Sequence, residues 1–240
     1  MDYKLQISNI HQIFNKGELN EVYALKDITL NFKSGELVLL TGHNGSGKST
    51  LLNIVDGRIN QTEGNVIIDK INIDNLKVYQ RAKYIYRIFQ NTLNGVIQMA
   101  SIRENMAFAS KRNSRFKLTT KLIKKSENKS FENIVDKYNK TLSKNLDKKI
   151  FTLSPGERQA VILSLLEIQK ESEPQILLAD EPTASLDPEM AKKSFNTICD
   201  LAKKGWLCLV VTHDENLING NLYSRIIKFN KGELEYDKYC

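Results

Sequence analysis

Apolar and polar positions along the chain predict strands that alternate with helices. Residues 25–32 alternate apolar and polar side chains with period two, as in a strand that buries one face. Short apolar runs, typical of strands buried on both faces, occur at residues 37–40, 176–179 and 207–211, and a further strand is expected at 226–229. Helical patterns occupy residues 48–55, 154–169 and 188–203. This alternation predicts an α/β fold with a mainly parallel, covered sheet.

The pattern changes at the start and in the middle of the chain. The N-terminal third is β-rich, with two further short strands expected at residues 5–10 and 66–68. From residue 91 to 152 helical spacing dominates, and Ser101 with Glu104 has the form of a capping box that opens a helix. We therefore expect a single domain, residues 1–240, with a core from 1–90 and 153–240 and a helical subdomain from 91–152.

The charge of the chain is uneven. It carries 35 Lys or Arg and 28 Asp or Glu, a formal net charge of +7, which by itself would suggest a nucleic-acid partner. Residues 111–149 hold thirteen basic and four acidic side chains, so this segment has a net charge of +9 and the remainder has −2. Apolar residues recur within the segment at roughly helical spacing. We interpret its lysines as the solvated faces of amphipathic helices and expect no nucleic-acid partner.

Composition limits the class of protein further. Hydrophobic residues make up 41% of the chain, which is ample for a packed core and too much for a disordered chain. No apolar run approaches the ~18 residues that span a bilayer, and the first residues lack the apolar stretch of a secretory signal. The three cysteines show neither metal-binding nor disulfide-framework spacing, which fits a reducing compartment.

A glycine-rich loop carries the clearest chemistry. It reads Gly42-His43-Asn44-Gly45-Ser46-Gly47-Lys48-Ser49-Thr50 and lies between a buried strand and a helix. This is the phosphate-binding loop pattern, in which backbone N–H groups and the helix N-terminus face phosphates. Lys48 would reach the β- and γ-phosphates of a nucleotide, and the Ser49 hydroxyl would hold Mg²⁺. The alternative is an ordinary glycine-rich turn, which the pattern and its context together disfavour.

Two adjacent carboxylates follow the apolar strand at residues 176–179. Asp180, at the strand end, can support Mg²⁺, and Glu181, one residue further, can point at an attacking water and act as a general base. Such a pair alone would indicate a solvated strand end. With a phosphate-binding loop upstream, it indicates nucleotide hydrolysis.

The segment Leu153-Ser154-Pro155-Gly156-Glu157-Arg158-Gln159 predicts the start of a helix. Ser154 is the expected N-cap, Pro155 takes the first helical position, and Glu157 is the reciprocal capping residue. A capped helix N-terminus with a flexible glycine can also face an anion. The structural and the functional interpretation are compatible.

Taken together, these residues resemble the nucleotide-binding subunit of ATP-binding-cassette (ABC) transporters over essentially the whole chain. Residues 153–159 resemble the family's signature motif, and Ser154 and Gly156, which approach the γ-phosphate in the family, are kept. Pro155 and Glu157 depart from the usual Leu-Ser-Gly-Gly-Gln. A carboxylate at Glu157 would repel a phosphate unless it stays engaged in capping. The resemblance implies a P-loop NTPase core with a mainly parallel sheet, an N-terminal antiparallel β subdomain and an inserted α-helical subdomain.

Further residues take their roles from the resemblance alone. Gln90 is similar to the residue that contacts Mg²⁺ and the nucleophilic water, and His213 to the switch histidine that senses the γ-phosphate. Asp187, in Ser185-Leu186-Asp187, resembles the loop that reaches across a dimer. Phe14 is the candidate for the aromatic side chain that stacks on adenine, and Tyr23 is its rival. The implied catalytic residues are Lys48, Gln90, Glu181 and His213, and the implied Mg²⁺ ligands are Ser49, Gln90 and Asp180.

The resemblance also implies partners. One chain would supply half of each of two ATP sites, and Ser154 and Gly156 of a second copy would close on the same γ-phosphate. The expected protein is an ATPase on the cytoplasmic face of the cell membrane that powers separate permease subunits. Residues 81–90 and 101–106 are similar to an importer-like subgroup, some of whose members are encoded with permeases proposed to carry aromatic amino acids. An importer of a small solute, such as an amino acid, would also need an external binding protein.

Three alternatives stay open. The loop between Phe14 and Ala24 is similar to those of drug-exporting or lipoprotein-releasing cassettes. A DNA-repair or chromosome-structure ATPase would fit the basic charge, although such proteins usually insert long coiled coils or zinc sites that this sequence lacks. A nucleotide-binding regulator without turnover is the third, against which the presence of Glu181 and His213 argues.

Overall fold

The computed structural model describes residues 2–111, 125–169, 175–184, 186–214, 217–218, 220 and 222–240. The chain divides into two compact units. The first unit comprises Met1–Arg87, Pro174–Glu181 and Ile198–Cys240. The second comprises Ile88–Glu173 and Pro182–Thr197. The subdomain boundaries expected at residues 91 and 152 stay a prediction.

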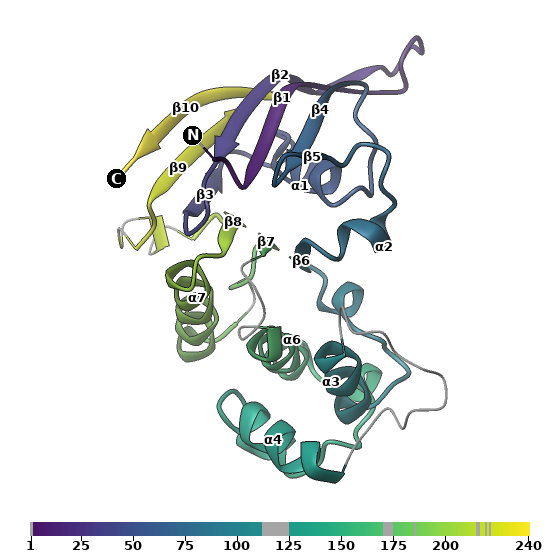
Figure 1. Ribbon diagram of the computed structural model, residues 1–240, viewed down its shortest axis with the longest axis vertical. Helices are drawn as coiled ribbons and strands as arrows, with labels where there is room; N and C mark the ends of the chain where they lie inside the picture. The colour runs from purple at the N-terminus through teal and green to yellow at the C-terminus, as the bar shows by residue number, and fades with distance from the viewer. Residues whose placement is uncertain are drawn as a thin grey trace. The chain divides into compact units, whose positions relative to one another are not determined.

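A six-stranded sheet has the strand order β10-β9-β3-β8-β7-β6 (Figure 1). Its strands are β3 (Leu37–Thr41), β6 (Ile85–Ile88), β7 (Ile176–Asp180), β8 (Leu207–Val211), β9 (Arg225–Asn230) and β10 (Glu233–Tyr239). β3 pairs in parallel with β8 and β9, β7 pairs in parallel with β8, and β10 is antiparallel to β9. Every residue of β3, β7 and β8 is buried, so the apolar runs are confirmed as central strands.

A second, antiparallel sheet in the first unit has the order β2-β1-β4-β5. Its strands are β1 (Leu5–Phe14), β2 (Val22–Phe32), β4 (Glu63–Ile68) and β5 (Ile71–Asn72). β1 lies between β2 and β4 and is antiparallel to both. The expected antiparallel β subdomain is therefore confirmed, with strands longer than the apolar pattern alone suggested.

Helix α1 (Lys48–Val55) packs in one core with residues of both sheets. Its end is fixed by Arg81, from the short helix α2 (Val78–Arg81), whose guanidinium donates hydrogen bonds to Ile54 O at 2.7 Å and Val55 O at 3.1 Å. The carbonyl groups at a helix C-terminus need such donors, because the helix itself supplies none. Gly57 makes room for this side chain, since a Cβ there would lie 2.7 Å from Arg81 Nε.

The second unit is helical. It contains η1 (Thr92–Gly95), α3 (Ile102–Ser110), α4 (Lys125–Asp136), α5 (Lys140–Ser143), η2 (Ile150–Thr152) and α6 (Pro155–Gln169). Helix α7 (Pro188–Lys203) begins in this unit and ends in the first. A separate apolar core, which includes Met106, Phe131 and Leu142, holds α3 to α6 together.

The basic segment is only partly visible, because residues 112–124 lie outside the described residues. In the part that is described, five lysines are exposed: Lys129, Lys137, Lys140, Lys144 and Lys149. Apolar neighbours such as Val135 and Leu142 are buried, which agrees with amphipathic helices whose lysines are solvated. None of the helices in the described part of the chain has both the length and the apolar character needed to cross a bilayer.

Candidate functional site

The glycines of the loop after β3 are required by the backbone. Gly42 has φ 132°, and a Cβ at this position would lie 2.2 Å from the carbonyl oxygen of Phe229. Gly47 has φ 105°, and its Cβ would lie 2.6 Å from Ala24 O. Other residues rarely adopt such φ values, and no side chain fits these approaches. The loop is therefore shaped by contact with β9 on one side and β2 on the other.

One part of the loop is held by the turn between β9 and β10, and another part is exposed to solvent. Ser46 O accepts a hydrogen bond of 3.1 Å from the N–H of Gly232, in the turn between β9 and β10. Ser46 and Gly47 are buried, whereas His43, Asn44 and Gly45 are exposed. Helix α1 begins at Lys48, close in the chain to these exposed residues, and the first N–H groups of a helix have no acceptor within the helix. An anion at this position would be favoured by those groups and by the helix dipole.

Lys48 closes the loop on itself. Its Nζ donates hydrogen bonds of 2.7 Å to Gly42 O and 2.9 Å to His43 O. Burial lowers the pKa of Lys48, and the nearby carboxylates of Glu181 and Asp180 oppose that shift. The ammonium group therefore lies at the loop, with two acidic residues close enough to influence it.

Ser49 and Asp180 meet across the first unit, 131 positions apart in the chain. The Ser49 hydroxyl donates to Asp180 Oδ1 at 3.3 Å. A hydroxyl and a carboxylate oxygen at this distance form the hard donor set that Mg²⁺ prefers, with its remaining positions left to water or phosphate. These residues therefore fit a magnesium ion. Among the described residues, clusters of three or more His, Cys, Asp or Glu side chains that could hold a metal are absent.

Glu181 has an unusual backbone. Its φ is 49°, in the left-handed region that favours glycine, and its N–H donates to Val211 O at 3.0 Å. His213 follows the neighbouring strand β8, and its Nε2 lies 3.6 Å from Glu181 Oε1. The two side chains are thus brought together at the same sheet edge, where the C-terminal ends of β7 and β8 meet. Strained residues of this kind often mark functional sites.

Two residues next to this site whose side chains are only 8% and 7% exposed, Arg87 and Asp56, were not singled out from the sequence. Arg87, in β6, donates from Nη2 to Asp180 Oδ2 at 3.1 Å, and its Nε lies 3.8 Å from Asp56 Oδ2. Asp56 follows the last residue of α1. An arginine inside the otherwise apolar strand was the available signal, because a buried guanidinium requires a carboxylate or a carbonyl partner.

The second unit contains four predicted site residues: Gln90, Ser154, Gly156 and Asp187. Ser154 forms the predicted capping box, since its N–H donates to Glu157 Oε2 at 2.8 Å and its Oγ accepts from the Glu157 N–H at 3.2 Å. A Cβ at Gly156 would meet nothing within 4 Å. The N-terminus of α6 is therefore capped by its own side chains and remains open at Gly156.

The remaining predicted residues lie at exposed or capping positions. Gln90 is exposed just after β6, and Asp187 Oδ1 accepts a hydrogen bond of 3.0 Å from the N–H of Met190 at the start of α7. Ser185 lies outside the described residues. Phe14 and Tyr23, the two candidates for adenine stacking, are 36% and 51% exposed, so either ring is accessible.

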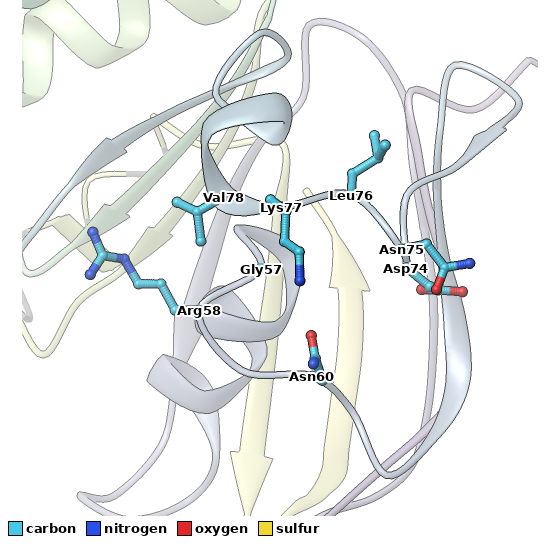
Figure 2. A pocket seen from close by; sticks show the side chains of 8 residues that line it. All are labelled: Gly57, Arg58, Asn60, Asp74, Asn75, Leu76, Lys77 and Val78. Atoms are coloured by element: carbon cyan, nitrogen blue, oxygen red, sulfur yellow. The ribbon is translucent and has the colours of Figure 1, made fainter.

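A separate cavity of 270 Å³ lies in the first unit and is lined by Gly57, Arg58, Asn60 and residues 74–78 (Figure 2). Asp74 at its edge already accepts hydrogen bonds from the Gln61 side chain at 2.7 Å and the Val66 N–H at 3.0 Å. Its carboxylate thus serves the packing of the β4–β5 region. We assign this cavity no part in the candidate site.

Comparison with known proteins finds relatives along the whole chain. The sequence matches the ABC transporter family over residues 25–184. A tyrosine transport ATP-binding protein of Clostridioides difficile is 34% identical over 241 residues, covering 97% of this chain and 91% of the relative. The lipoprotein-releasing system ATP-binding protein LolD of Acinetobacter baylyi is 32% identical over 218 residues, covering 89% and 90%.

The fold has a solved counterpart. A dimeric structure of a post-hydrolysis state of the ATP-binding cassette MJ0796, bound to ADP and Pi, superposes with a TM-score of 0.80. It is 29% identical in sequence, and the match covers 98% of each chain. This likeness extends to both compact units of the present chain.

Proposed function

This chain belongs to the ABC transporter family as an ATP-binding subunit with ATPase activity, and we propose that its first unit supplies the phosphate- and magnesium-binding half of the ATP site. The meeting of Ser49 and Asp180 at 3.3 Å beside the loop carries this proposal. Gly42 to Thr50 would surround the phosphates with backbone N–H groups, and Lys48 would exchange its bonds to loop carbonyls for bonds to phosphate oxygens.

Each catalytic residue has a task that its surroundings support. Glu181 would take the proton of the attacking water, and the neighbouring imidazole of His213, 3.6 Å away, would hold that carboxylate or sense the γ-phosphate. Ser49 and Asp180, joined by Gln90, would hold Mg²⁺, which would neutralise charge on the phosphates. The adenine ring would stack on Phe14 or Tyr23. Asp187 would act near the dimer contact.

The other half of the site would come from a second copy of the chain. Ser154 and Gly156 of the partner subunit would approach the γ-phosphate, and the open space around Gly156 would admit it. The dimeric state of the MJ0796 cassette supports this arrangement. Glu157 is engaged by the Ser154 N–H, and Lys148 Nζ lies 4.0 Å from its other oxygen. The carboxylate of Glu157, which departs from the usual signature sequence, is thus already bound by a backbone N–H group and lies near a lysine.

Permease subunits would bind the second unit. Three large apolar side chains are exposed there soon after Gln90 or beside that segment: Ile97, Met99 and Phe151. The N–H of Phe151 donates to Gln98 O at 3.2 Å, which places these side chains in one area. Exposed apolar patches of this kind mark protein interfaces. The subunit would then work at the cytoplasmic face of the cell membrane.

We favour an importer of a small solute such as an amino acid, with an external binding protein, since a tyrosine transport ATP-binding protein is 34% identical over nearly the whole chain. A lipoprotein-releasing or exporting system is the second candidate, supported by the 32% identity to LolD. The permease that copurifies with the tagged chain from native membranes separates them: a relative of amino-acid permeases supports import, and a relative of lipoprotein-releasing permeases supports release.

The assignment of Glu181 is tested by Glu181→Gln. We expect the rate of ATP hydrolysis to fall by at least about 100-fold, because the general base is lost. Dimerisation in ATP, followed by size-exclusion chromatography with light scattering, should persist because the phosphate contacts remain. Glu189→Gln, an exposed exchange of the same kind on α7, is the control and should hydrolyse ATP at the parent rate. Undiminished hydrolysis by Glu181→Gln would refute the role of Glu181.

A further inference from the structure

Arg87 places a buried positive charge between two carboxylates. Its side chain is only 8% exposed. Nη2 donates to Asp180 Oδ2 at 3.1 Å, while Nε lies 3.8 Å from Asp56 Oδ2. Nε and Nη2 lie on the same edge of a guanidinium group, so this edge is shared between the two acids. Burial lowers the pKa of Arg87, and both carboxylates oppose that shift.

Asp56 is itself held in place. Its Oδ1 accepts a hydrogen bond of 3.1 Å from the N–H of Arg58, and the Arg58 side chain approaches Oδ2 to 3.4 Å. The Asp56 side chain is 7% exposed. The fixed carboxylate of Asp56, at the end of α1, thus anchors the Nε side of the Arg87 guanidinium group.

The two carboxylate oxygens of Asp180 have different partners. Arg87 takes Oδ2, and Oδ1 accepts from the Ser49 hydroxyl at 3.3 Å. With one oxygen bound on each side, the carboxylate cannot rotate without breaking a hydrogen bond. Were Arg87 removed, Asp56 and Asp180 would lose the buried cation that they share, which is unfavourable.

We propose that Arg87 is a positioning residue for the magnesium site: anchored by Asp56, it holds Asp180 Oδ2 so that Oδ1 faces Ser49. The inference rests on the proposed function, because it takes Ser49 and Asp180 as the magnesium-binding pair. Partners in the second coordination sphere of a metal commonly set its affinity in this way. Arg87 touches neither nucleotide nor metal in this role and acts through Asp180.

The experiment measures the metal directly. ADP is mixed with an excess of the full chain, so that nearly all ADP is protein-bound, and the Kd of Mn²⁺ for the complex is determined from the free Mn²⁺ signal in electron paramagnetic resonance. We expect Arg87→Met to weaken Mn²⁺ about 10-fold. The affinity for ADP in EDTA should change less than about twofold, a split that a general loss of structure would not give. Arg87→Lys keeps the positive charge but lacks the two guanidinium nitrogens that face Asp56 and Asp180, so it should weaken Mn²⁺ binding by about threefold.

A second variant separates positioning from charge repulsion. Asp56→Asn combined with Arg87→Met removes the anchoring carboxylate together with the cation, so the repulsion between Asp56 and Asp180 is gone while the group that holds Asp180 Oδ2 is still missing. Mn²⁺ binding should therefore stay about 10-fold weaker than in the parent. Should Arg87→Met fail to fold, Arg87→Lys and this double variant carry the test. Arg58→Met is the matched control. Arg58 pairs with Asp56 as Arg87 does, but its side chain is far more exposed, and it also lines the cavity in Figure 2. The exchange should leave Mn²⁺ affinity within about twofold of the parent.

Two results would overturn the inference: unchanged or tighter Mn²⁺ binding in Arg87→Met, or parent-like Mn²⁺ affinity in the double variant, which would mean that repulsion from Asp56 and not the loss of positioning weakens Mn²⁺ binding in Arg87→Met. The proposed function is tested separately by Asp180→Asn. If Asp180→Asn binds Mn²⁺ as tightly as the parent, the magnesium site itself is misplaced, whatever Arg87 does. If Asp180→Asn loses Mn²⁺ while Arg87→Met retains it, only the role of Arg87 is wrong.

Discussion

Helices α1 and α6 both begin at a glycine-containing segment that was predicted to face phosphate, yet they treat their N-termini differently. At α1 the N-cap is Gly47, which has no side chain with which to cap, and the loop before it is fixed by contacts that only glycine allows. At α6 the side chains of Ser154 and Glu157 satisfy two backbone donors between them. The cap of the first helix provides no side-chain acceptor for its donors, whereas the second helix satisfies two donors with its own side chains.

Helix α3 shows what a capping box does on its own. Ser101 and Glu104 repeat the arrangement of α6, with bonds of 2.6 Å and 3.2 Å between the backbone of one and the side chain of the other. Lys149 lies 3.5 Å from Glu104, much as Lys148 lies 4.0 Å from Glu157. No nucleotide role was predicted for α3. The box is therefore a structural device, and what distinguishes α6 is the free space at Gly156.

We expect the largest difference between the two helix starts when a glycine of each is replaced by alanine. Gly42→Ala would place its Cβ 2.2 Å from Phe229 O at φ 132°, so the backbone of the loop or of β9 must move. We expect a loss of about 3 kcal/mol, from left-handed strain and overpacking together. Gly156→Ala enters open space in the first turn of a helix and should stay within about 1 kcal/mol of the parent, on the stabilised side.

Urea denaturation of the two glycine variants measures both values in one series. The sum of strain and clash corresponds to a fall in melting temperature of roughly 6–12 °C for Gly42→Ala. Equal stabilities of the two variants would contradict the view that the first loop is shaped by its glycines and the second is not.

The affinity for ATP tests whether the loop before α1 binds phosphate, and Lys48 is the residue to replace. Lys48→Ala removes a buried ammonium from beside the loop, and charge-assisted bonds to phosphate are worth about 1.5–3 kcal/mol. We therefore expect ATP affinity, measured by isothermal titration calorimetry, to fall about 10- to 100-fold. Lys144→Ala, an exposed exchange in the second unit, is the control and should bind ATP as the parent does. Parent-like affinity in Lys48→Ala would count against the role of the loop.

The sequence was a good guide where chemistry is local. The loop glycines, the strand ending in Asp180 and both capping boxes follow from residues close together in the chain, and the parallel sheet follows from the apolar runs. The nearness of Ser49 to Asp180, or of Glu181 to His213, depends on the order of the strands, which periodicity does not specify. The phosphate-binding-loop pattern suggested that Ser49 and Asp180 serve one magnesium ion, and the family resemblance suggested that Glu181 and His213 serve the same ATP.

Buried arginines were the main omission. Arg87 and Arg81 lie in segments that helical and strand patterns describe as ordinary, and their partners are distant in sequence or are backbone carbonyls. Arg225 is similar: it is 4% exposed and pairs with Asp237 and Glu36. A hydropathy pattern counts each as polar and places it outside. Only the three-dimensional arrangement reveals which carboxylate or carbonyl group each of them satisfies.

The smallest expected effect on stability comes from replacing the N-cap serines Ser154 and Ser101, and comparing the two variants tests the role of α6 in the dimer. Ser154→Ala and Ser101→Ala each remove an N-cap from an equivalent box, so each should lower stability by about 1 kcal/mol. If α6 also closes on the γ-phosphate of a partner's nucleotide, only Ser154→Ala should weaken dimerisation in ATP. Light scattering with the Glu181→Gln background, which holds ATP without turnover, measures that difference. Matched losses of dimer in both variants would mean that α6 contributes to the dimer only through the stability of the second unit, because the two boxes would then be interchangeable.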